Sequence, residues 1–269
     1  LIEAGVIKDI ASKITADNIP IIDADFHLVT PPFVDSHFHM DATLSYGLPR
    51  VNKSGTLLEG IKLWGELKPN LTADAIKERA LKFCKWAVAR GTLAIRSHVD
   101  VSGQNLVGVE ALLDVRETMK DFIDIQLVAF PQDGLLRANC LDNLNTALDM
   151  GVDVVGGIPH FERTMEEGHE SIRILCEIAE KRGLLTDLHC DETDDPMSRH
   201  VEKLALETTR LGLKGRVAGS HLTSMHSIDN YYFTKLISLL VEADLNIIAN
   251  PLINITIQGR QDNYPKRRG

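Results

Sequence analysis

The chain has 269 residues, of which 44% are hydrophobic and 25% are charged. This composition is ordinary for a globular protein and excludes disordered, collagen-like and coiled-coil chains. Lys and Arg number 29 against 38 Asp and Glu, so the net charge is −9 and neither nucleic acid nor an anionic membrane is expected as a partner. No apolar stretch approaches the roughly 18 residues that a membrane span needs.

The cysteines are scattered and form no C-x-x-C pair. This spacing argues against a disulfide framework and against a cysteine-rich zinc site, and it is typical of a reducing, cytoplasmic location. The four residues are Cys84, Cys140, Cys176 and Cys190.

Residues 1–30 carry short apolar alternations without a helical period, which predicts a few strands and turns. From Phe33 onward, a strand pattern followed by a helix pattern repeats along the chain. Most of the strands are apolar on both faces, as in a parallel sheet that is covered on both sides. The expected strands are 33–39, 93–101, 125–130, 152–158, 184–189, 216–221 and 245–250.

Amphipathic helices are expected between these strands. In the first, Thr72 can cap the start and Gly91 can end it. Repeated βα units of about 30 residues favour an α/β fold of the TIM-type (β/α)8 barrel class over an open sheet, but seven strands are found where eight are needed. We therefore expect a barrel that is truncated after the seventh strand. The expected helices are 72–90, 106–120, 141–150, 171–182, 196–211 and 228–243.

Histidines cluster at or just after the carboxyl ends of the predicted strands, which is the rim that carries active sites in barrels. His37 and His39 alternate on one strand, so both imidazoles face inward and can chelate one ion, although H-x-H also occurs by chance. His189 can supply a third nitrogen and leave a coordination position open for water. A bound divalent ion lowers the pKa of that water to about 7.

Two further residues are candidates for proton chemistry. Glu192 follows His189 by three residues and can serve as the general acid and base, although its spacing alone favours a solvated loop carboxylate beside Asp191. His221 could ligate the ion, polarise a substrate carbonyl or orient the hydroxide, or it could be a hydrogen-bonded core histidine.

The remaining histidines carry weaker signals. Asp100 lies on the same strand face as His98, so His98 could be oriented by it as readily as it could bind the ion. His160 is interpreted as structural. Surface positions without a role are expected for His27, His169, His200 and His226.

The segment 31–41, with the sequence PPFVDSHFHMD, resembles the first-strand metal motif of the amidohydrolase superfamily. Motifs from about residue 31 to residue 269 resemble, in order, those of its cytosine deaminase branch. The H-x-H motif is generic, whereas 130–132, 189–192 and 264–269 are specific to this branch. The matching stretches include 54–61, 96–101, 128–134, 157–162, 189–192, 220–227 and 249–260.

This resemblance implies one divalent metal ion, Fe²⁺ or Zn²⁺, held by His37, His39 and His189. Nitrogen and oxygen ligands suit both metals. The resemblance also implies that Glu192 is the proton shuttle and that His221 positions or polarises the attacking water.

Substrate binding is likewise implied by the resemblance. Gln132 would bind the amide-like edge of a pyrimidine, helped by the backbone near Leu57. The implied reaction is attack of metal-bound hydroxide on C4 of cytosine, proton delivery by Glu192 and loss of ammonia to give uracil. Glu192 then needs a pKa raised toward neutrality.

One family feature has no counterpart in the sequence. The fourth metal ligand of the family is an aspartate on the eighth strand, and we expect this chain to lack it. Residues 1–30 would be the N-terminal part of a small β domain, and 31–269 a metal-dependent hydrolase barrel incomplete at its C-terminus that deaminates little. The resemblance also suggests a homo-oligomer.

Two alternatives stay open at this point. The chain could deaminate another N-heterocycle, such as a triazine or a purine-like base, or it could be an inactive barrel that serves only as a binding or scaffold protein. A substrate panel read by ammonia release separates these readings.

Overall fold

The computed structural model describes residues 1–16 and 18–260, so the 264–269 stretch lies outside the described residues. Two compact units divide the chain, Leu1–Pro31 and Pro32–Gly269. In the first unit, β1 (Ile2–Glu3) pairs antiparallel with β2 (Val6–Ile7). The other described residues of this unit form no helix or strand. Its membership of a small β domain stays a prediction.

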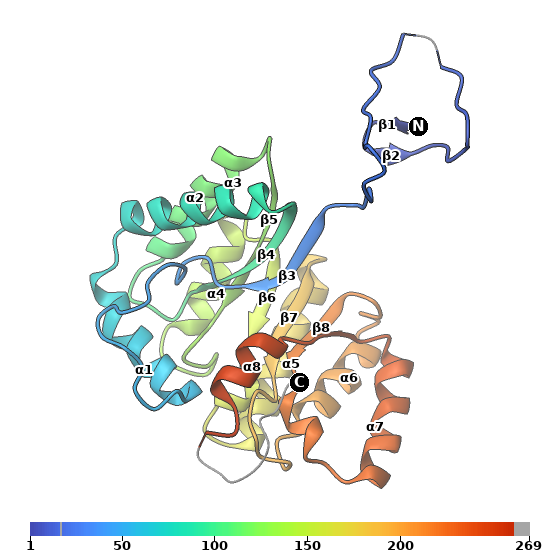
Figure 1. Ribbon diagram of the computed structural model, residues 1–269. Coiled ribbons are helices and arrows are strands. Elements are labelled where there is room, and N and C mark those ends of the chain that lie inside the picture. The colour runs from blue at the N-terminus through green and yellow to red at the C-terminus, as the bar shows by residue number, and fades with distance from the viewer. Residues whose placement is uncertain (17, 261–269) are drawn as a thin grey trace. The chain divides into compact units, whose positions relative to one another are not determined.

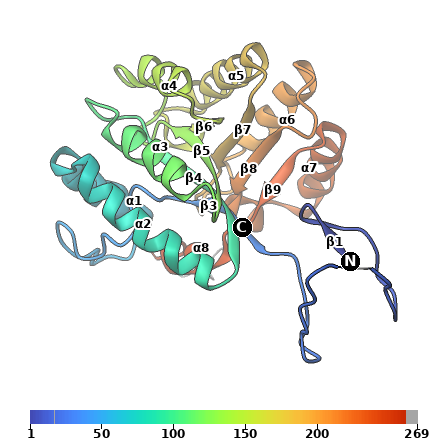
Figure 2. The same ribbon diagram turned by 90° about the horizontal axis from the view of Figure 1, so that it is seen from above.

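The second unit contains a seven-stranded parallel sheet whose strands follow one another in chain order. Figure 2 shows the sheet curved, with helices on its outside. This arrangement confirms the prediction of an α/β, TIM-type barrel with seven strands. Among the described strands, β3 and β9 have one partner each. The strands are β3 (Phe33–Phe38), β4 (Thr92–Asp100), β5 (Asp124–Phe130), β6 (Val154–Gly157), β7 (Leu185–Cys190), β8 (Val217–His221) and β9 (Asn246–Ile248).

The six expected helices correspond to α2 through α7, which connect successive strands (Figure 1). α5 begins before the expected position because Thr164 caps it, and α6 begins later, at His200. α1 and α8 were not predicted. Within the described part of the chain, no helix is long and apolar enough to cross a membrane. The helices are α1 (Leu57–Leu67), α2 (Ala73–Ala89), α3 (Val107–Met119), α4 (Cys140–Asp149), α5 (Met165–Arg182), α6 (His200–Arg210), α7 (Asn230–Ala243) and α8 (Pro251–Ile257).

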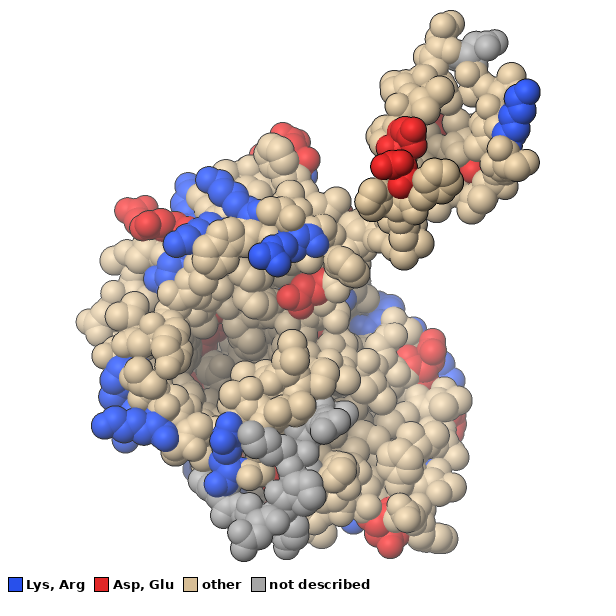
Figure 3. Space-filling model, in the orientation of Figure 1, with Lys and Arg blue, Asp and Glu red and all other residues tan. Residues whose placement is uncertain are grey.

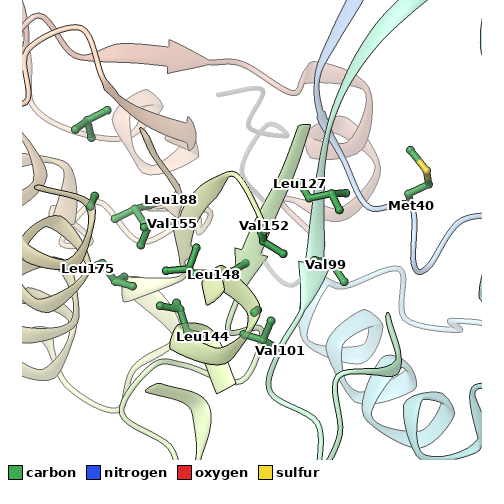
Figure 4. Packing of buried hydrophobic residues seen from close by; sticks show 14 of the residues in the cluster. Met40, Val99, Val101, Leu127, Leu144, Leu148, Val152, Val155, Leu175 and Leu188 are labelled. Atoms are coloured by element: carbon green, nitrogen blue, oxygen red, sulfur yellow. The ribbon is translucent and has the colours of Figure 1, made fainter. Parts of the chain in front are cut away.

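The core lies between the sheet and the helices that cover it. Figure 4 shows Leu144, Val155 and Leu175 among the side chains that meet there, and all three are fully buried. Close packing leaves no room at two glycines of β6. A Cβ at Gly156 would lie 2.6 Å from the carbonyl oxygen of Ala129, and one at Gly157 would lie 2.4 Å from Leu175 Cδ1.

We expect Gly156→Ala to destabilise the protein by about 1–3 kcal/mol, because the added methyl group meets rigid backbone of β5. Urea unfolding measures this change. Gly65→Ala on α1 is the control, since an added Cβ there meets nothing within 4 Å. The control should be neutral or stabilising by up to about 1 kcal/mol, because Ala favours helices over Gly. Equal unfolding midpoints for the two variants would contradict this packing.

Candidate active site

A cavity of about 630 Å³ opens at the carboxyl ends of the strands, and Figure 3 shows a hollow between the regions that Figure 1 labels α1 and α8. Apolar side chains of α1 and α8, including Trp64 and Ile257, complete its wall. A second cavity of about 650 Å³ lies at the opposite strand ends around Arg96 and Arg216, and none of the predicted site residues lines it. The first cavity is lined by all seven of them, His37, His39, Leu57, Gln132, His189, Glu192 and His221.

Four imidazoles line the floor of the first cavity and the buried ring of His98 lies against them, because parallel strands bring their carboxyl ends to one edge. His39 Nε2 lies 2.9 Å from His189 Nε2, and His37 Nε2 lies 3.1 Å from His221 Nε2. The ring of His98 lies 4.4 Å from that of His37, measured between centroids. These rings come from strand ends that lie far apart in the sequence, and the fold brings them together.

Burial keeps four of these rings uncharged, those of His37, His39, His189 and His221. It lowers the pKa of His37, His39 and His189 well below the ordinary range, and the neighbouring imidazoles lower it further. Burial also lowers the pKa of His221 to about 3. Each of these four rings is neutral at pH 7 and keeps one nitrogen lone pair for a ligand or a proton.

The imidazole cluster fits a divalent cation. The ligand atoms of His37, His189 and His221 all lie within 4.8 Å of one another, and so do those of His37, His39 and His98. Among the described residues, Nδ1 of His37 and Nδ1 of His189 are buried without a hydrogen-bond partner. Nitrogens bound to one tetrahedral zinc ion lie about 3.3 Å apart, close to the two short contacts in the cluster. The cluster can therefore hold a metal ion.

Glu192 lies beside this cluster with only 4% of its surface exposed, in contrast to the solvated carboxylate that its spacing alone favours. Burial raises its pKa to about 8. Its Oε1 lies 3.2 Å from His221 Nδ1, which also lies 3.0 Å from Asn254 Oδ1. At pH 7 Glu192 is protonated and His221 is neutral, so their contact is not an ion pair.

Contacts among charged and polar side chains hold α1 next to the cavity. Asp100 Oδ2 accepts hydrogen bonds from Trp64 Nε1 at 2.6 Å and from Lys68 Nζ at 3.3 Å. Lys68 Nζ also lies 2.6 Å from Asp133 Oδ2, and Asp133 follows the predicted substrate residue Gln132. These contacts hold the apolar wall of the cavity against the strand ends.

Two expectations about the other histidines are wrong. The partner of His98 is Asp187, whose Oδ1 lies 3.6 Å from His98 Nε2, since Asp100 binds α1 instead. His200 is not on the surface: it is 3% exposed and its Nδ1 lies 2.9 Å from Asp191 Oδ1. Both contacts join different segments of the chain, so no local pattern could reveal them.

Comparisons with known proteins show the family of this chain. Residues 20–269 match the amidohydrolase family. The chain is 31% identical over 263 residues to N-isopropylammelide isopropyl amidohydrolase of Pseudomonas sp. strain ADP, covering 91% of this chain and 63% of that protein. It is 29% identical over 271 residues to pterin deaminase of Rhizobium rhizogenes, covering 98% and 61%.

Among solved structures, 5-methylcytosine deaminase from Klebsiella pneumoniae liganded with phosphonocytosine superimposes with a TM-score of 0.86 at 44% identity. The match covers 88% of this chain and 58% of that chain. This chain thus spans about three fifths of the length of these relatives. The resemblance to the cytosine deaminase branch is confirmed.

We expect Zn²⁺ to bind the metal-free chain and to raise its melting temperature, because an ion at 100 times its Kd stabilises a protein by about 2.7 kcal/mol. His39→Ala or His189→Ala should weaken binding at least about tenfold, since each removes an imidazole nitrogen from the cluster. Calorimetric titration measures the affinity. His226→Ala, an exposed histidine outside the cluster, is the control. Unchanged affinity in both cluster variants would rule out this site.

Proposed function

We propose that this chain, which belongs to the amidohydrolase family, carries the catalytic barrel of a deaminase that releases ammonia from cytosine or 5-methylcytosine. The observation that carries the proposal is the single cavity shared by buried Glu192, the imidazole cluster and Gln132. The 44% identity to a 5-methylcytosine deaminase over 88% of this chain supports a pyrimidine over the heterocycles of the other relatives.

We assign one divalent ion, Fe²⁺ or Zn²⁺, to His37, His39 and His189. These neutral imidazoles meet at the cavity floor, and neither metal requires other donor types. When bound, such an ion lowers the pKa of a coordinated water to about 7 and so supplies hydroxide at neutral pH.

Glu192 moves the protons in the proposed reaction. As the oxygen of water bonds to C4, one proton passes through the Glu192 carboxyl group to the ring nitrogen. A second proton passes to the exocyclic amine, the C4–N bond breaks, and ammonia leaves while C4 keeps a carbonyl oxygen. A pKa of about 8 suits this work, because the group can both donate and accept a proton near neutral pH.

The other residues orient the reactants. His221 lies between Glu192 and His37, so it can hold the attacking water and the carboxyl group in position relative to each other. Gln132 offers an amide N–H and a carbonyl to the amide-like edge of the pyrimidine. Leu57 and Trp64 supply an apolar wall from α1 for the ring.

Glu192→Gln tests this role, because glutamine keeps the shape of the side chain but carries no exchangeable acid proton. We expect deamination of cytosine by the metal-loaded chain to fall roughly 100-fold or more. Binding of 5-fluorocytosine and metal content should stay near wild type. Chromatography of the product, calorimetry and metal analysis measure the three quantities.

Glu207→Gln is the matched control, since Glu207 is a buried carboxylate on α6 that does not line the cavity. Equal rates in wild type and Glu192→Gln would contradict the assigned role. Isopropylamine from N-isopropylammelide, or ammonia from a pterin, with no ammonia from either cytosine, would move the substrate to another heterocycle. Bound metal with no amine or ammonia released from any of them would favour a binding protein.

A further inference from the structure

We infer that the buried carboxylate of Asp191, held by Ser198 and His200, is a positioning group that sets Glu192 and His189 in place. The inference rests on the proposed function and adds residues outside the cavity to it. Asp191 is the first residue after β7, fully buried, and lies in the chain between the proposed metal ligand and the proposed proton shuttle.

The Asp191 carboxylate accepts a dense set of hydrogen bonds from the segment that begins α6. Its Oδ1 lies 2.7 Å from Ser198 Oγ, 2.9 Å from His200 Nδ1 and 3.0 Å from the His200 backbone nitrogen. Its Oδ2 lies 2.9 Å from the backbone nitrogen of Val201. Arg199 makes no side-chain cap, so the first N–H groups of α6 are satisfied by the end of β7.

The backbone of Asp191 is tied in a second direction. Its carbonyl oxygen accepts from Ser224 N at 3.1 Å and from Thr223 Oγ1 at 3.2 Å. Both residues belong to the segment that follows His221 at the end of β8. Asp191 thus joins the two strand ends that carry the proposed proton-transfer residues.

The backbone of Asp191 is left-handed and lies in the middle of these contacts. Its φ is +52°, a conformation that is uncommon for residues other than glycine and that aspartate adopts more readily than most. The next residue, Glu192, is turned toward His221 by this bend. The ring of His200 is itself confined, because a Cβ at Gly168 would lie only 2.3 Å from its Nε2.

A purely structural role for this network predicts lower stability with unchanged chemistry. A positioning role predicts more, because displacing a catalytic group by about 1 Å can cost about 100-fold in rate. Substitutions of Ser198 and His200 distinguish the two roles. Neither residue lines the cavity that holds the proposed substrate, so a change in rate cannot come from a lost substrate contact.

The experiment compares Ser198→Ala and His200→Asn with Thr164→Ala in the full chain. Thr164→Ala removes the cap of α5, where Thr164 Oγ1 accepts from Glu167 N at 3.1 Å, and serves as a matched loss of a helix anchor. We expect the two Asp191-side variants to lower kcat at least about tenfold with little change in KM. Both variants should also alter the visible spectrum of bound Co²⁺, because a displaced His189 changes the coordination of the ion. Thr164→Ala should lower the melting temperature alone.

Ser198→Thr keeps the hydroxyl group and should restore kcat to within about twofold of wild type. Wild-type kcat and an unchanged Co²⁺ spectrum in Ser198→Ala and His200→Asn would overturn the inference and leave a structural role. Absence of deamination in the wild-type chain would overturn the proposed function instead. The Co²⁺ spectra then decide the positioning role: altered bands support it and unchanged bands contradict it.

Discussion

Burial of five imidazoles and one carboxyl group at the same end of a parallel sheet is the constraint on which the proposed chemistry depends. Water is excluded from these groups, so the protonated form of His37, His39, His189 and His221 is disfavoured. The same exclusion keeps the proton on Glu192. Neutral donors facing a small cavity are what a divalent ion needs, and a protonated carboxyl group beside them is what proton transfer to a heterocycle needs.

The scaffold maintains this arrangement with contacts that lie outside the cavity. Parallel strands deliver the histidines to one edge, and left-handed residues at Asp191 and His221 end two of the strands abruptly. Lys68 and Asp100 hold α1 over the opening, while Asp187 lies beneath the cluster, close to His98. Contacts of α1 on one side and of Asp187 on β7 on the other therefore hold the cluster in place.

Local patterns in the sequence predicted what depends on one segment at a time. The strands, the six main helices and the placement of His37, His39, His189 and His221 at one end of the sheet followed from hydrophobic period and strand-end position. α1 was missed although Thr56 and Glu59 form a capping signature at its start. The pairing of Asp191 with His200 was missed for a different reason, since it depends on how two segments fold together.

Anomalous diffraction from crystals of the zinc-loaded chain tests the central claim most directly. The account predicts one zinc peak at the floor of the cavity, with imidazole nitrogens of His37, His39 and His189 at about 2.0–2.1 Å from the ion. A zinc ion bound elsewhere on the chain, or a cavity that stays free of metal at saturating zinc, would contradict it.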